Sequence, residues 1–88
     1  MIGARLRALR RLCGVSQKSL AEAVRVSPSA IGMYEQDRRE PSLDRLVALA
    51  RRFGVSTDYL LTGEIRTPRD ELAAEHFAAL SRAAAAKR

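Results

Sequence analysis

The sequence has little cysteine, few aromatic residues and no long apolar run. Its 88 residues include one cysteine, Cys13, which cannot form an internal disulfide or supply a cysteine-based zinc site. No apolar run approaches the roughly 20 residues that a membrane-spanning helix requires. The two tyrosines, two phenylalanines and absent tryptophan leave few rings for stacking on unpaired bases. These features argue against a disulfide scaffold or a membrane-spanning segment, and a reducing, cytoplasmic compartment is expected.

Motifs typical of enzymes are also missing from the sequence. There is no Gly-rich phosphate loop, no nucleophile-elbow motif and no histidine with a suitable nucleophile. The single histidine, His76, has only Glu75 or Asp70 near it at helical spacing, which does not make a metal site. Asp70 and Glu71 lie at the start of a predicted helix, where capping explains them. We therefore expect no enzyme activity and no bound metal or cofactor.

Positive charge is concentrated in the first part of the chain. The net charge is +6, and residues 1–54 hold eleven basic and five acidic side chains, whereas residues 55–88 hold five of each. Such an excess suits a polyanion such as nucleic acid, an anionic membrane surface, or simple solubility. Composition alone leaves these three interpretations open.

Helix start and stop signals recur along the chain. Serine or threonine precedes every apolar-periodic segment after the first, and glycine or a polar, proline-containing loop follows most of the segments. The predicted caps are Ser16, Ser27, Ser42, Ser56 and Thr67, and the predicted glycine stops are Gly14, Gly54 and Gly63. No segment alternates with a period of two, so no sheet is expected. The prediction is an all-α protein with a compact five-helix domain over residues 1–63 and a linker plus C-terminal helix over residues 64–88.

Apolar residues at helical spacing define the expected core. The fourth helix is expected to turn Leu43, Leu46, Val47, Ala50 and Phe53 inward. The other core positions are Ile2, Leu6, Leu9, Leu20, Val24, Val26, Ile31, Val55 and Leu60. This set is large enough for one small core.

The C-terminal helix has an apolar stripe of its own. Thr67 and Pro68 mark its start, and Ala73, Phe77, Leu80 and Ala84 follow with the spacing of a coiled-coil seam. Two heptads are too few to be stable alone, so this helix needs support from the domain or from a partner. We expect the four seam residues to form a dimer contact or to bind another protein.

Residues 17–36 have the pattern of two short helices joined by a tight turn. Leu20, Val24, Ile31 and Tyr34 are placed to face the core, and Ala21 is small where the two helices cross. This is the arrangement of a helix-turn-helix, whose second helix enters the major groove of DNA. The stretch from Ile2 to Gly63 resembles the phage Cro/repressor-type (XRE-like) helix-turn-helix family. The marks of that resemblance are Val15-Ser16-Gln17, Leu20-Ala21, Val26-Ser27, Ile31, Tyr34-Glu35, Glu40-Pro41-Ser42-Leu43 and Phe53-Gly54-Val55-Ser56.

The resemblance implies a homodimeric repressor that binds double-stranded operator DNA through the helix over residues 28–35. The implied DNA-binding residues are Gln17, Lys18, Ser27, Pro28, Ser29, Gly32, Met33, Gln36, Arg38 and Arg39. It also implies a structural pair between Arg10 and Glu35. By contrast, we expect Arg7 on a solvated helix face. A protein that binds operator DNA in this way would be associated with the nucleoid.

Two features depart from the family pattern. Arg25 stands where the family usually has glycine, so the turn is either strained or shaped differently, and the arginine has a possible phosphate contact. Pro28, Gly32 and Met33 offer no side-chain hydrogen bond to a base, which leaves Ser29, Gln17 and DNA shape for readout. An alternative function remains, an antitoxin-like or anti-regulator protein that uses the C-terminal helix to bind a protein partner. Nonspecific nucleic-acid binding is a third.

Overall fold

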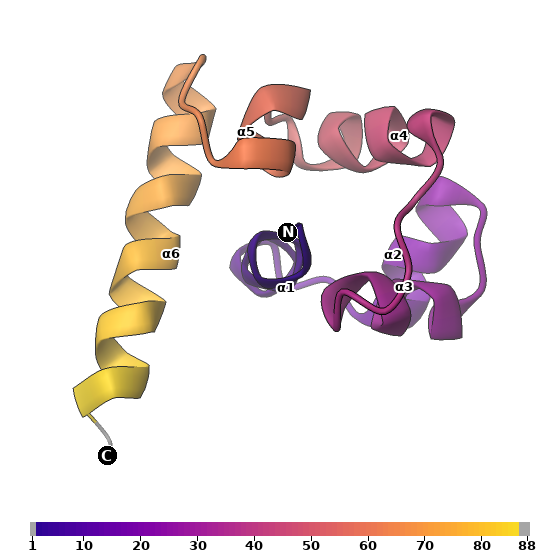
Figure 1. Cartoon of the computed structure of the whole chain (residues 1–88), viewed down its shortest axis with the longest axis horizontal. Coiled ribbons are helices and arrows are strands. Elements are labelled where there is room, and N and C mark those ends of the chain that lie inside the picture. The colour runs from indigo at the N-terminus through magenta and orange to yellow at the C-terminus, as the bar shows by residue number, and fades with distance from the viewer. Residues whose placement is uncertain (1, 87–88) are drawn as a thin grey trace.

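The chain folds into six helices, and residues 2–86 contain no strand. A computed structural model describes residues 2–86 and the side chains of residues 2–83. The helices are α1 (Gly3–Leu12), α2 (Gln17–Val24), α3 (Pro28–Glu35), α4 (Leu43–Phe53), α5 (Thr57–Thr62) and α6 (Pro68–Ala86). Figure 1 shows α1 near the centre, with α2 and α3 on one side of it and α6 on the other. The expected all-α architecture is confirmed.

The predicted caps set the helix boundaries. In four helices a serine hydroxyl accepts the backbone N–H three residues further on, at 3.0–3.3 Å, which satisfies one of the free donors of the first turn. These serines are Ser16, Ser27, Ser42 and Ser56. Gly54 and Gly63 end α4 and α5 in the left-handed conformation. Both sets of signals are therefore confirmed as helix boundaries.

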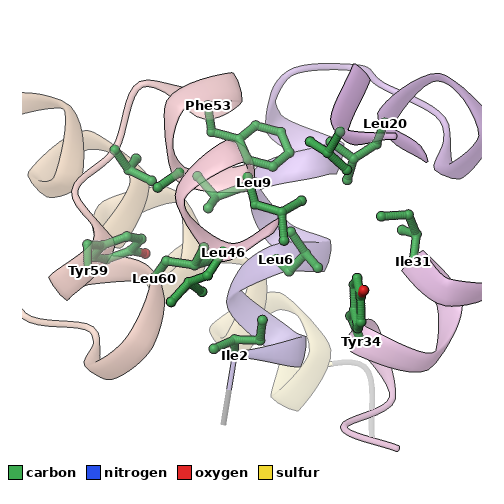
Figure 2. Close-up of a cluster of buried hydrophobic side chains, with 14 of the residues drawn as sticks. Ile2, Leu6, Leu9, Leu20, Ile31, Tyr34, Leu46, Phe53, Tyr59 and Leu60 are labelled. Atoms are coloured by element: carbon green, nitrogen blue, oxygen red, sulfur yellow. The ribbon is translucent and has the colours of Figure 1, made fainter. Parts of the chain in front are cut away.

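The hydrophobic core surrounds α1. Figure 2 shows Leu6 and Leu9 of α1 between the side chains of α4 and α5 and those of α2 and α3. The largest fully buried apolar side chains are Phe53, Leu6, Leu20, Ile31, Leu49 and Leu60. Because every helix contributes to this one cluster, the orientation of α2 and α3 depends on the whole domain.

The expected inward face of α4 is partly wrong. Leu43 is 81% exposed and Val47 is 38% exposed, whereas Leu49, which was not in the predicted set, is fully buried. The buried face follows positions 46, 49, 50 and 53, and Val47 lies about 100° away from its centre. Leu43 occupies the first helical position after the Ser42 cap, where the helix begins and the core no longer covers it.

The start of α6 is fixed to the α4–α5 corner by a buried carboxylate. Asp70 is fully buried, and it accepts hydrogen bonds from the backbone N–H and hydroxyl of Ser56 at 2.8 and 2.6 Å. It also accepts the backbone N–H groups of Arg66 and Thr67 at 2.9 and 3.1 Å. Burial alone raises the pKa of Asp70, but these hydrogen bonds outweigh it, and the pKa lies below its ordinary value. The first turn of α6 is therefore an integral part of the packed domain.

The apolar seam of α6 begins against its own domain. Ala73 is 4% exposed and belongs to the core cluster, which contradicts its expected role as a free partner contact. Phe77 is half-buried, and Leu80 is exposed at the edge of a groove between α6 and α1. Ala84 lies outside the residues whose side chains are described. The contacts of Asp70 direct the first turns of α6, and with them Ala73, onto α1.

Candidate nucleic-acid interface

The predicted two-helix segment is present as α2, a tight turn and α3. The Val26 backbone N–H donates to the Ala21 carbonyl at 3.0 Å and closes the turn, with Arg25 in the left-handed conformation at φ 60° and ψ 49°. Six buried side chains hold the two helices together: Leu20, Ala21, Val24, Ala30, Ile31 and Tyr34. The two helices are therefore packed as one unit with the core.

The residues implied as DNA contacts lie mainly at the surface. Exposed among them are Lys18, Ser27, Pro28, Ser29, Met33, Gln36, Arg38 and Arg39, while Gln17 and Gly32 are half-buried. The hydroxyl groups of Ser27 and Ser29 lie 3.1 Å apart at the start of α3. These positions come from the start of α2, the solvent side of α3 and the loop that follows α3, so they are available to a ligand outside the chain.

A buried ion pair fixes α3 to α1. The side chain of Glu35 is fully buried at the end of α3, and it accepts Arg10 Nε at 2.7 Å and Arg10 Nη2 at 3.1 Å. Burial raises the pKa of Glu35, but hydrogen bonds from Arg10, Gln17 and Arg7 and the charge of Arg10 outweigh it, so this pKa lies below its ordinary value. The structure thus brings Arg10 and Glu35 together as a bidentate, charge-assisted pair.

The same carboxylate also holds Gln17. The Gln17 amide nitrogen donates to Glu35 Oε1 at 3.2 Å, across the gap between α2 and α3. A Cβ on Gly32 would lie 3.9 Å from that nitrogen, an ordinary contact distance, so packing does not require glycine at position 32. One amide hydrogen of Gln17 is engaged by Glu35, and the second hydrogen and the carbonyl oxygen are left for other partners.

The loop after α3 is tied to the start of α1. Asp37 is left-handed at φ 56°, and its carboxylate accepts the Gly3 backbone N–H at 3.0 Å. A Cβ on Gly3 would lie only 2.4 Å from the Glu35 carbonyl oxygen, so glycine permits this close approach of α1 to α3. Arg38 and Arg39 follow at once, are exposed, and form no ion pair with the described residues. The loop thus holds two unpaired cations beside α3.

Sequence reasoning missed two members of the Glu35 cluster. Arg7 was expected on a solvated face, and its Nε lies 3.4 Å from Glu35 Oε1 with the side chain 45% exposed. Gln17 was expected as a DNA contact, and its side chain also contacts Glu35. The positions of Arg7 and Arg10 three residues apart on α1 place both on one helix face, and this spacing was the available signal.

No group of three or more His, Cys, Asp or Glu side chains in the described part of the chain is arranged to hold a metal ion. None of its helices is both long enough and apolar enough to cross a membrane.

Comparisons with known proteins agree with the geometry. Residues 6–60 match the helix-turn-helix family. The chain is 44% identical over 57 residues to the uncharacterized HTH-type transcriptional regulator YobD of Bacillus subtilis, which covers 65% of this chain and 51% of that protein. It is 37% identical over 65 residues to repressor protein C2 of Salmonella phage P22, which covers 74% of this chain and 30% of that protein. The chain spans about half the length of the first curated relatives that it matches.

Two solved structures show the same arrangement of helices. The P22 c2 repressor in complex with a synthetic operator superposes with a TM-score of 0.70 at 38% identity, covering 73% of this chain and 97% of that one. The clp gene regulator ClgR of Corynebacterium glutamicum superposes with a TM-score of 0.65 at 30% identity, covering 97% of this chain and 84% of that one. The second similarity extends over almost the entire chain, including α6.

Proposed function

This chain belongs to the helix-turn-helix family of the Cro/repressor type, and we propose that it is a sequence-specific DNA-binding transcriptional regulator that represses as a homodimer on operator DNA. One observation carries the proposal. The solvent side of α3 is exposed, and the cations beside it, Lys18, Arg38 and Arg39, form no ion pair within the described chain. The opposite side of α3 is fixed to the domain by buried contacts. The superposition on a repressor that is bound to a synthetic operator supports it.

The proposed binding mode places α3 in the major groove. Ser29 supplies a hydroxyl for a base edge, and Met33, 41% exposed, supplies an apolar contact for a thymine methyl. Lys18, Arg38 and Arg39 bind phosphates on either side of the groove, which fixes the position of α3 without reading sequence. Because α3 carries few polar side chains, DNA shape contributes to the sequence preference.

Gln17 has a defined role in this binding mode. Its amide is held by Glu35, and the remaining N–H is free to donate to a phosphate at the start of α2. The Arg10–Glu35 pair then stabilises the domain and also sets the orientation of this amide. The proposed surface around α3 also includes Ser27, Pro28, Gly32 and Gln36.

The second copy is proposed to contact an apolar surface next to the DNA-binding loop. Leu43 and Leu61 are 81% and 46% exposed, and with Ile2 they line a groove that Arg38 and Arg39 also border. In the proposed dimer the two-fold axis lies beside this groove and both copies of α3 face the same side of the DNA, with half-sites about 34 Å apart. Burial of these leucines removes exposed apolar area from water.

This homodimer is favoured over a foreign partner bound to α6. The partner hypothesis depended on an exposed stripe, and the burial of Ala73 and the partial burial of Phe77 leave only Leu80 exposed in the described part of that stripe. Analytical ultracentrifugation of L43D and L80D separates the two surfaces. We expect L43D to be monomeric and L80D to remain dimeric, and the reverse result would move the contact to α6.

Selection of binding sites from a random-sequence DNA pool tests the proposed function. We expect the full chain to enrich a short two-fold symmetric sequence. On that sequence R38Q weakens binding by a similar factor for every base substitution, because Arg38 contacts phosphate. S29A lowers the discrimination between bases at one or two positions. No enrichment by the folded chain would refute the proposal.

A further inference from the structure

Two residues other than glycine have a positive φ within the described chain. They are Arg25 at φ 60° and Asp37 at φ 56°. This left-handed conformation brings the Cβ of an L-residue close to its own carbonyl oxygen, so it is strained for arginine and less unfavourable for aspartate. Strain of this kind persists where the residue has a use that offsets it.

The use of Asp37 lies inside the chain. Its carboxylate accepts the Gly3 backbone N–H at 3.0 Å and ties the loop after α3 to the start of α1. A glycine at position 37 would lose this hydrogen bond. The strain at Asp37 is therefore offset by a contact that only its side chain makes.

Arg25 has no such contact. Its side chain is exposed and makes no hydrogen bond, ion pair or ring contact with any described residue. Its backbone N–H is directed at the Ala21 and Glu22 carbonyls at the end of α2, and glycine would make the same contacts without strain. No contact within residues 2–83 therefore favours arginine over glycine at position 25.

The position of Arg25 is next to the proposed DNA surface. It lies two residues before Ser27, the N-cap of α3, and three residues before Pro28, a separation of at most about 11 Å along the chain. The major groove that would receive α3 is about 12 Å wide and is bordered by phosphates. A cation placed at the turn is thus within reach of the strand that flanks the start of α3.

We propose that Arg25 is a phosphate-binding residue whose guanidinium contacts the DNA backbone beside the first turn of α3. This inference rests on the proposed function. A guanidinium donates two parallel hydrogen bonds to a phosphate, which gives a strong, sequence-independent contact. The arginine thus contributes to the complex and not to the free domain.

Three substitutions at position 25 separate charge from strain. R25G removes both, R25Q removes the charge and keeps a strained residue, and R25K keeps the charge and the strain. The probe is a fluorescein-labelled duplex of about 30 base pairs that carries the sequence selected by the wild-type chain. Fluorescence anisotropy between 50 and 200 mM salt gives the affinity and its salt dependence, and thermal unfolding followed by circular dichroism gives Tm.

The expected results for stability and binding have opposite signs. R25G raises Tm by a few degrees, on the order of 4 °C, because the strain is relieved. R25G and R25Q both weaken DNA binding and make the negative slope of log K against log salt shallower by about 0.9, so their loss of affinity relative to wild type is about 3.5-fold larger at 50 than at 200 mM. R25K keeps the wild-type slope, and R38Q serves as a positive control for the loss of one phosphate contact.

Several outcomes overturn the assignment. Wild-type affinity and slope in R25G and R25Q would mean that Arg25 does not touch DNA. A lower Tm in R25Q with unchanged DNA binding would mean that the charge of Arg25 stabilises the C-terminal end of α2 and does not contact DNA. A loss confined to one base pair of the site would make it a base contact. If the wild-type chain itself fails to bind any duplex, the proposed function fails, which is a different result.

Discussion

Replacement of Arg10 by methionine should destabilise the domain far more than the same change at Arg7. Both arginines lie on α1 and both contact Glu35, but only Arg10 forms a bidentate pair, at 2.7 and 3.1 Å. The side chain of Arg10 is 15% exposed and that of Glu35 is fully buried. R10M therefore leaves a buried carboxylate whose remaining donors are Arg7 at 3.4 Å and Gln17 at 3.2 Å.

The magnitude follows from the burial of the two partners. Removing one member of a buried ion pair costs about 3–5 kcal/mol, because the other charge stays out of water without compensation. The Arg7 side chain is 45% exposed, and a screened pair of that kind contributes about 0–1 kcal/mol. Single domains are stable by about 5–15 kcal/mol, so R10M removes a large part of the total.

Urea denaturation followed by circular dichroism measures both variants, and its pH dependence adds a second check. In the wild type the pKa of Glu35 is depressed, so its stabilisation is present above the unfolded pKa and is lost as pH falls through the folded pKa. In R10M the hydrogen bonds and the charge of Arg10 no longer lower the pKa of Glu35, so that variant has less of this stabilisation to lose as the carboxylate is protonated. The difference in unfolding free energy between wild type and R10M should narrow at acid pH.

Equal losses for R10M and R7M would refute this reasoning. So would a difference between wild type and R10M that widens as the pH is lowered. Methionine fills a similar volume at both positions, so the pair of variants controls for lost packing of the arginine stem.

Two further predictions concern the core and α6. D70N should lower the free energy of unfolding by about 2–4 kcal/mol, because a neutral amide replaces a carboxylate that accepts four hydrogen bonds, two of them from Ser56. It should also speed hydrogen exchange in α6 more than in α3. Equal exchange in the two helices would contradict this. L49A should cost about 2–5 kcal/mol in urea denaturation, whereas V47A should cost under about 1 kcal/mol, since Leu49 is fully buried and Val47 is 38% exposed. Similar values for the two would mean that the face of α4 is assigned incorrectly.

Much of the fold follows from local sequence signals. Ser27 with Pro28 fixes the start of α3, and Gly54 fixes the end of α4, because caps act through backbone groups within one turn. The spacing within residues 17–36 likewise determined the two-helix unit. These features depend on neighbours in the chain, which a single sequence contains.

Contacts between distant segments were less predictable. Asp70 looked like an acid placed near a helix dipole, and it is instead a buried acceptor for Ser56, fourteen residues away. Ala73 lies on an apolar seam with the spacing of a partner contact, but in the structure it is packed in the core of its own domain, where α6 contacts α1. Helical periodicity gives the apolar face of a helix, but only the packed structure shows which part of the face is covered and by what.

Competition between selected and scrambled duplexes tests the central claim most directly. The full chain is titrated with a labelled duplex carrying its selected site, and unlabelled selected or scrambled DNA competes at several salt concentrations. We predict that the selected site binds at least about 10³-fold more tightly and that affinity falls linearly on a log–log plot against salt. Equal competition by the two duplexes, or affinity that does not change with salt, would contradict sequence-specific recognition through α3.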